Sequence, residues 1–319
     1  MIFSTHPLHS DVSARLMARG KYVVASSPTA AAIMSEGTGA EVIIVRAPVP
    51  VDYFGAAKAL RAVVRHGAGL DMIPIDAATA AGVLVANVPG ANAPTVAEHV
   101  IFSAIALRRQ FRRMDAALRR DGWAAGRAFS DHGRDMGGAT LGILGFGNVG
   151  RALHRVAVAM GMDVIASTPR ADSLPDGVAP VTLDGLVAKS DVLALCCPLN
   201  DATRGVISAA RIGRMKRDAV LINVSRGPVV DQAALTDALR AGRILGAALD
   251  VFDTQPLPMD DPLFGMDNVI LTPHMAGITE DSMLRMGTGA ADEVLRILDG
   301  GLPLNLCNPA VLPAYRARF

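Results

Sequence analysis

Residues 140–170 read TLGILGFGNVGRALHRVAVAMGMDVIASTPR, and this stretch decides the fold. A short apolar run, Leu141 to Leu144, ends at glycines spaced G-x-G-x-x-G; a helical apolar pattern and a second run, Val164 to Ala166, follow. Glycines let the backbone turn sharply and approach a pyrophosphate, whose charge then lies at a helix N-terminus. This order predicts a dinucleotide-binding βαβ unit, although a glycine pattern alone can simply turn the chain. The turn residues expected to contact the cofactor are Gly145, Phe146, Gly147, Asn148, Val149 and Gly150.

The whole sequence limits the class of protein. Its 319 residues are enough for two domains. With 31 basic and 30 acidic residues the net charge is +1, which gives no global attraction to nucleic acid or membranes and favours small-molecule partners. The cysteines, Cys196, Cys197 and Cys307, form neither a disulfide framework nor a metal-ligand spacing. Without a secretory signal or an apolar span, we expect a soluble cytoplasmic protein with no metal.

Short apolar runs alternate with helical patterns along most of the chain, which predicts an α/β fold built on doubly wound parallel sheets. In such sheets, ligands bind beyond the carboxyl ends of the strands. An amphipathic helix is expected over Asp281 to Leu298, followed by an extended tail over 303–313. The expected strands are 22–25, 42–45, 62–65, 83–86, 141–144, 164–166, 191–196, 219–224, 246–251 and 268–271.

A long helix is expected over Thr95 to Arg120, bridging the two domains, and an irregular arm over 121–139 follows it. The late part of this helix is rich in arginine. Such a run could bind nucleic acid, but at helical spacing it is more typical of a solvated or subunit-facing surface. The arginines are Arg108, Arg109, Arg112, Arg113, Arg119 and Arg120.

The loop HGAGLD, residues 66–71, follows an expected strand. Its glycines, Gly67 and Gly69, expose backbone N–H groups that could hold an anion. The alternative is an ordinary turn that needs positive φ angles, and the loop by itself leaves both interpretations open.

Three polar residues follow the carboxyl ends of expected strands: Arg226, Gln255 and His274. Residues at these strand ends converge at one edge of a parallel sheet, beside a bound nicotinamide. An arginine there can hold a carboxylate through two parallel hydrogen bonds, and a histidine can exchange a proton near neutral pH. Each could be structural alone, but together with the dinucleotide turn they favour catalysis.

Six collinear segments resemble the D-isomer-specific 2-hydroxyacid dehydrogenase family over nearly the full length of the chain. The segments are GAGLDMIPID, NVPGANAPTVAEHV, GILGFGNVG, INVSRGPVVD, ALDVFDTQPLP and ILTPHMAGIT. The resemblance implies a Rossmann-type cofactor domain, 98–284, and a discontinuous flavodoxin-like substrate domain, 1–97 and 285–319. It also implies a homodimer.

The resemblance also implies residue roles. Arg226 would bind the substrate carboxylate and carbonyl, and His274, paired with Gln255, would be the acid/base and lie beside the cofactor. The backbone of Gly67, Ala68 and Gly69 would hold the substrate carboxylate, and Asp250 would hold the nicotinamide carboxamide. The remaining positions matched to the cofactor are Cys197, Pro198, Val224, Ser225 and Gly277.

The first departure from the family pattern is Gln255, where a glutamate is usual. A carboxylate beside a histidine stabilises the imidazolium, whereas a neutral amide orients the ring without supplying charge. Because reduction of a keto acid needs a protonated His274, we expect an optimum at more acidic pH than in glutamate-bearing relatives. Relatives acting on formate also carry glutamine here, but nothing else favours formate.

The second departure lies about 20 residues beyond the glycines, where NAD enzymes carry an acid that binds the ribose hydroxyls. Here Thr168 occupies that place. Ser167 and Thr168 can bind a 2′-phosphate and Arg170 can neutralise it, which predicts a preference for NADP(H) over NAD(H). Alternatively, Arg170 is an exposed surface residue and the choice of cofactor is relaxed.

The sequence therefore predicts an NAD(P)-dependent oxidoreductase that transfers a hydride between a nicotinamide cofactor and a small 2-keto or 2-hydroxy acid. A glyoxylate or hydroxypyruvate reductase is the favoured form. A D-3-phosphoglycerate-type dehydrogenase and a non-catalytic dinucleotide-sensing corepressor are the alternatives.

Overall fold

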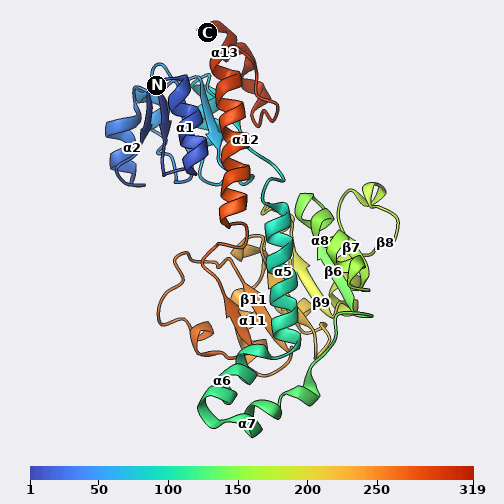
Figure 1. Cartoon of the computed structure of the whole chain (residues 1–319). Coiled ribbons are helices and arrows are strands. Elements are labelled where there is room, and N and C mark those ends of the chain that lie inside the picture. The colour runs from blue at the N-terminus through green and yellow to red at the C-terminus, as the bar shows by residue number, and fades with distance from the viewer. The chain divides into compact units, whose positions relative to one another are not determined.

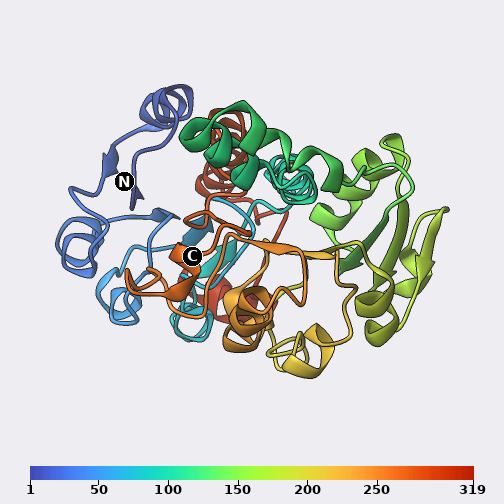
Figure 2. The ribbon, with the colours of Figure 1, turned by 90° about the horizontal axis from the view of Figure 1, so that it is seen from below.

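The computed structural model describes residues 1–319 and divides the chain into two compact units (Figures 1 and 2). Unit 1 comprises Met1–Asn92 and Ile278–Phe319, and unit 2 comprises Ala93–Gly277. Both chain ends, marked N and C in Figure 1, therefore belong to unit 1. The boundaries expected from the sequence, 97/98 and 284/285, lie five and seven residues after these divisions.

Unit 1 is built on a five-stranded parallel sheet in the order β2-β1-β3-β4-β5. This is the flavodoxin-like order that the family resemblance implies, and the order reverses between β1 and β3. The β3 strand is buried throughout, as its run of Val and Ile requires for a strand covered on both faces. The strands are β1 (Ile2–Ser4), β2 (Tyr22–Val24), β3 (Val42–Val45), β4 (Ala62–Arg65) and β5 (Leu84–Ala86).

The helix α12 (Glu280–Leu298) joins unit 1 from the far end of the chain and packs against α1 and β4. It begins at a capping box formed by Thr279 and Ser282. The sequence predicts an extended tail over 303–313, and this is only partly correct. Leu306 forms a bridge to β5, but the chain is helical from Pro309 onward. The other helical elements are α1 (Ser10–Arg19), α2 (Ala30–Gly37), α3 (Tyr53–Ala56), α4 (Ile75–Ala80), η5 (Pro309–Val311) and α13 (Leu312–Arg318).

Unit 2 contains a seven-stranded parallel sheet in the order β12-β11-β10-β9-β6-β7-β8. The order reverses beside β6, the strand that precedes the glycine turn, which is the Rossmann arrangement predicted from the sequence. The strands are β6 (Thr140–Leu144), β7 (Asp163–Ser167), β8 (Val178–Pro180), β9 (Val192–Leu195), β10 (Val220–Asn223), β11 (Gly246–Leu249) and β12 (Val269–Leu271).

The predicted helix from Thr95 to Arg120 is two helices, because Gln110 adopts a left-handed conformation with φ of 50°. The arm that follows is also partly helical. No helix in the structure has both the length and the apolar character needed to cross a membrane. The helical elements of unit 2 are α5 (Ala93–Arg108), α6 (Phe111–Asp121), α7 (Trp123–Arg127), η1 (Ser130–His132), α8 (Asn148–Ala159), η2 (Ala171–Ser173), α9 (Leu183–Lys189), α10 (Ala209–Ile212), η3 (Gly227–Val229), α11 (Gln232–Arg240) and η4 (Pro262–Gly265).

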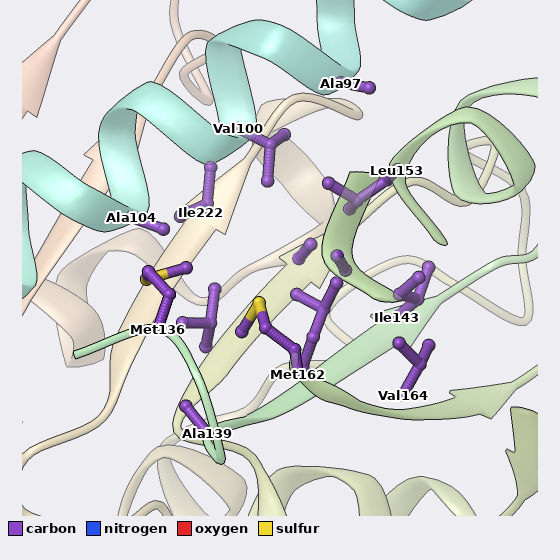
Figure 3. Close-up of a cluster of buried hydrophobic side chains, with 14 of the residues drawn as sticks. Ala97, Val100, Ala104, Met136, Ala139, Ile143, Leu153, Met162, Val164 and Ile222 are labelled. Carbon is purple, nitrogen blue, oxygen red and sulfur yellow. The ribbon is translucent and has the colours of Figure 1, made fainter. Parts of the chain in front are cut away.

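One core of unit 2 lies between α5 and the sheet (Figure 3). Ala97, Val100 and Ala104 of α5 face Ile143 of β6 and Ile222 of β10 in this buried cluster. Burial of such side chains stabilises the fold by about 1.5–3 kcal/mol for each Val or Ile. The helix α5 thus packs against α8 and against β10 and β11 of the sheet.

Most of the arginine run is exposed, as its helical spacing predicts, and Arg108 is the buried exception. Arg108 is buried and donates to the carbonyl of Asp135, while Arg109 pairs with the Asp135 carboxylate at 2.8 Å. Arg112 donates to the carbonyl of Val269. Arg108 and Arg109 therefore connect the end of α5 to the arm, and Arg112 connects α6 to β12.

Candidate functional site

The glycine turn directly follows β6, and close contacts require two of its glycines. Gly145 has φ of 88°, and a Cβ there would lie 2.7 Å from the Cα of Cys197. A Cβ at Gly150 would lie 2.9 Å from the carbonyl oxygen of Gly145. These two glycines therefore permit the turn and the close packing of α8 on the sheet.

Gly147 differs, because no protein atom lies within 4 Å of a Cβ built there and its φ is −86°. No side chain caps the start of α8, where Asn148 is exposed and Val149 half-buried. The helix therefore presents its first N–H groups beside an open backbone position, as a pyrophosphate needs. The Phe146 side chain is buried in the core, so only its backbone faces this turn.

The segment after β7 lies next to the turn, since the Gly145 N–H donates to the carbonyl of Ser167 at 2.9 Å. The Thr168 hydroxyl accepts from the Arg170 N–H at 3.3 Å, and the Arg170 side chain is exposed. The first carboxylate after the strand is Asp172, in η2. Hydroxyls and a guanidinium thus occupy the position of the acid that NAD enzymes place here.

The loops after β9 and β10 meet at Cys197 and Ser225. The Ser225 hydroxyl donates to the carbonyl of Cys197, which immediately precedes Pro198. Burial raises the pKa of the Cys197 thiol, although its contact with Ser225 opposes this, so the thiol stays protonated at neutral pH. Cys197 and Ser225, together with the adjacent Val224, therefore form an uncharged surface at the carboxyl edge of the sheet.

Arg226 follows β10, and a local network fixes its backbone. The Asn223 side chain donates to the Arg226 carbonyl at 3.0 Å and accepts from the Ser225 N–H at 3.0 Å. A Cβ at Gly227 would lie 2.0 Å from the main-chain carbon of Phe252. The Arg226 loop is therefore pressed against the loop after β11. Neither Asn223 nor Gly227 has a sequence signal that separates this role from ordinary packing.

Asp250, directly after β11, holds the loop that carries His274. One carboxylate oxygen accepts from the Thr272 hydroxyl at 2.7 Å and the Met275 N–H at 2.8 Å, and the other accepts from the Ala276 N–H at 2.9 Å. The Asp250 carbonyl accepts from the His274 N–H at 2.9 Å. These bonds offset the cost of burying the carboxylate.

The Asp250 network also explains the backbone of His274, a non-glycine residue with φ of 56°. Such a conformation persists only where its surroundings enforce it. Gly277, a predicted cofactor contact, follows the last amide that Asp250 binds. His99 of α5, for which no role was expected, also interacts with this region. Burial lowers the pKa of His99, and the negative charge of Asp250 partly opposes this shift.

His274 and Gln255 come together as predicted. The ring Nδ1 of His274 lies 3.3 Å from Oε1 of Gln255, and both side chains are exposed. An amide oxygen only accepts hydrogen bonds, so it favours the form of His274 with a proton on Nδ1. In that form Nε2 carries a proton for transfer only when the ring is the imidazolium.

The predicted anion loop lies in unit 1, after β4, where Gly67 has φ of 127°. The carbonyls of Gly67, Ala68 and Gly69 all accept hydrogen bonds within unit 1. The N–H groups of Ala68, Gly69 and Leu70 make no hydrogen bond within the chain. Consecutive unpaired N–H groups are what a backbone anion site requires, so the geometry of this loop is compatible with the predicted role.

All the candidate residues of unit 2 follow carboxyl ends of parallel strands and thus belong to one edge of its sheet. A cavity of about 710 Å³ lies at the opposite edge and is a separate feature. Its lining includes Gln110, Arg113 and Arg134 near the arm and Arg217, Leu245 and Asn268 near the strand starts.

No group of three or more His, Cys, Asp or Glu side chains is arranged to hold a metal ion.

Comparisons with known proteins identify relatives. Residues 101–276 match the family model described as "D-isomer specific 2-hydroxyacid dehydrogenase, NAD binding domain". The chain is 35% identical to a D-3-phosphoglycerate dehydrogenase of Methanocaldococcus jannaschii, over 98% of this chain and 60% of the relative. It is 38% identical to a glyoxylate reductase of Korarchaeum cryptofilum, over 83% of this chain and 81% of the relative.

Solved structures agree with the fold. A protein of Thermus thermophilus, TT0316, superposes with a TM-score of 0.88 at 30% identity, covering 96% of this chain and 99% of that chain. An NADPH-dependent glyoxylate/hydroxypyruvate reductase of Sinorhizobium meliloti superposes with a TM-score of 0.85 at 27% identity, covering 97% and 98%.

The two kinds of glycine predict different consequences of substitution. Gly147→Ala should leave the free energy of unfolding within about 0.5 kcal/mol of wild type, because its Cβ meets open space. The same change should weaken NADPH binding about tenfold or more, because the backbone can no longer approach the pyrophosphate. Urea unfolding and fluorescence titration measure the two effects.

Gly145→Ala is the matched control. It should destabilise the protein by about 1 kcal/mol or more, because its φ is 88° and its Cβ meets Cys197. If Gly147→Ala leaves NADPH affinity unchanged, the glycines only turn the chain.

Proposed function

The chain belongs to the D-isomer specific 2-hydroxyacid dehydrogenase family, and from this premise we propose that it reduces a small 2-keto acid such as glyoxylate or hydroxypyruvate. The main support is the contact between Gln255 and His274, whose loop Asp250 holds, at the sheet edge that also bears Arg226 and the glycine turn. The chain spans 60% of the Methanocaldococcus relative and 81% of the Korarchaeum reductase.

The nicotinamide cofactor would be held through the glycine turn, and when bound it supplies the hydride. Arg226 would orient the 2-keto acid by its carboxylate and stabilise negative charge developing on the carbonyl oxygen. His274 in its imidazolium form would donate the Nε2 proton to that oxygen. The N–H groups of the 66–69 loop would share the substrate carboxylate. Asp250, besides clamping the loop, keeps lone pairs that can accept from the nicotinamide carboxamide.

The cofactor we propose is NADP(H). Support comes from Ser167, Thr168 and exposed Arg170, which offer hydroxyls and a positive charge where a carboxylate would repel a 2′-phosphate. The Sinorhizobium reductase, which has the same fold, is NADPH-dependent.

A D-3-phosphoglycerate-type activity is the second candidate, favoured by Arg46. This residue follows β3, where the strand order of unit 1 reverses, and its guanidinium donates to the Pro7 carbonyl at 2.6 Å. Burial lowers the pKa of Arg46, and burial together with Arg46 lowers the pKa of His6. A phosphate on the substrate would match this cation, and one relative is a D-3-phosphoglycerate dehydrogenase.

We also propose that two copies associate and that the protein works in the cytoplasm. The helices α5 to α7 expose large apolar side chains, led by Trp123 at 77%, which a second copy would cover. All three cysteines are free thiols, which fits a reducing compartment. Light scattering, which measures the molar mass in solution, tests whether two copies associate. The other exposed side chains are Phe102, Ile105, Phe111 and Leu118.

Turnover tests the proposed reaction. We expect NADPH oxidation with glyoxylate or hydroxypyruvate, and a loss of kcat/KM on the order of 10²-fold in Arg226→Lys, because lysine cannot form the two parallel hydrogen bonds. The highest kcat/KM with 3-phosphohydroxypyruvate would favour the second candidate. Tight NADPH binding without turnover on any 2-keto acid would indicate a cofactor sensor.

Cofactor choice is tested with the same assay. We expect kcat/KM to be at least about tenfold higher with NADPH than with NADH, and Arg170→Ala to remove most of that difference because the 2′-phosphate loses its counter-charge. Arg155→Ala, which removes an exposed arginine of α8, is the control. A strong preference of the wild type for NADH would refute the assignment.

The pH profile of reduction tests the role of Gln255. In the proposed reaction, reduction requires protonated His274. The reductase activity should therefore be present at low pH and be lost as the pH rises. A carboxylate in Gln255→Glu stabilises the imidazolium, so half of the activity should be lost about one pH unit higher than in wild type. Superimposable profiles of kcat/KM against pH would contradict this role.

A further inference from the structure

We propose that Arg65 and Asn87 are positioning residues that shape the 66–69 loop into a receptor for a carboxylate. The proposal rests on the proposed function in that it takes the substrate carboxylate as the anion. The family resemblance assigned no role to either residue, and neither needs to touch the substrate. Their role is to hold the carbonyl groups of the loop so that its N–H groups are presented together.

Arg65, the last residue of β4, binds both ends of the loop. Its Nε donates to the Gly69 carbonyl at 3.0 Å, and its Nη1 donates to the His66 carbonyl at 2.6 Å. The same Nη1 donates to the Val45 carbonyl at 2.9 Å, which fixes the guanidinium to the end of β3. One planar group thus connects the first and last peptide units of the loop to a neighbouring strand.

The middle of the loop is held from the segment after β5. The Val88 N–H donates to the Gly67 carbonyl at 2.9 Å, and the Asn87 side chain donates to the Ala68 carbonyl at 2.8 Å. Three consecutive carbonyls, those of Gly67, Ala68 and Gly69, therefore have donors inside unit 1.

Peptide geometry converts these bonds into a binding surface. In a trans peptide unit the N–H points opposite to the C=O, so each fixed carbonyl turns the following N–H away from its donor. The N–H groups directed in this way belong to Ala68, Gly69 and Leu70, the three that make no hydrogen bond within the chain. A successive row of such donors binds an anion.

The holding groups also have an electrostatic effect. If the loop carbonyls were released, they could rotate toward the anion and repel it. Arg65 withdraws two of them with a charged donor and leaves positive charge behind the loop. A lysine keeps the charge but cannot span the His66 and Gly69 carbonyls with a planar fork. The geometry of the guanidinium therefore matters in addition to its charge.

The test uses Arg65→Lys and Asn87→Ala in the full chain, with oxalate as the carboxylate probe in the presence of NADP⁺. We expect Arg65→Lys to raise the KM for glyoxylate and the Kd for oxalate about tenfold, and Asn87→Ala about threefold. Both should change kcat and the Kd for NADPH less than about twofold. Hydrogen exchange of the Val88 amide should be faster in both variants, because its loop partner is released.

Arg61→Ala is the matched control, since Arg61 precedes the same strand at its other end and lies over the Phe319 ring. It should leave KM, the oxalate Kd and Val88 exchange as in wild type. Unchanged oxalate affinity in both test variants would overturn the proposal. If the wild type neither turns over keto acids nor binds oxalate, the proposed function fails; Val88 exchange then still decides, and wild-type protection in Arg65→Lys overturns the positioning role.

Discussion

The candidate site depends most on the hydrogen bonds that the buried carboxylate of Asp250 accepts. A buried charge is costly unless hydrogen bonds surround it, and here three donors come from one loop, at 2.7–2.9 Å. These donors lie on both sides of His274 in the sequence. The hydrogen bonds that stabilise the Asp250 carboxylate therefore also fix the left-handed backbone of that histidine. The same hydrogen bonds thus stabilise the loop and place the proposed proton donor.

The same arrangement recurs at two other loops that follow parallel strands. Asn223 holds the backbone around Arg226, as Asp250 holds the backbone around His274. Arg65 and Asn87 hold the carbonyls of the 66–69 loop. In each case a polar side chain binds main-chain groups that the sheet can no longer pair, and the residue or N–H group beside it becomes available to a ligand.

The charges near these loops fit anionic ligands of two kinds. In the proposed function, Arg226 and the loop amides would bind a substrate carboxylate, and Arg170 with Thr168 would bind a 2′-phosphate. The partner of His274 is the neutral Gln255, so the ring is oriented without a stabilising negative charge.

Local sequence patterns predict the parallel α/β architecture and the glycine turn, since apolar periodicity and residues after strand ends depend on neighbours along the chain. The family resemblance, and not a local pattern, implied the contact between His274 and Gln255. The break at Gln110, the helical tail and the burial of Arg108 depended on tertiary contacts. Only the tertiary structure showed what Asp250, Asn223 and Arg65 bind, because hydrogen bonds between separate loops leave no periodic signal in one sequence.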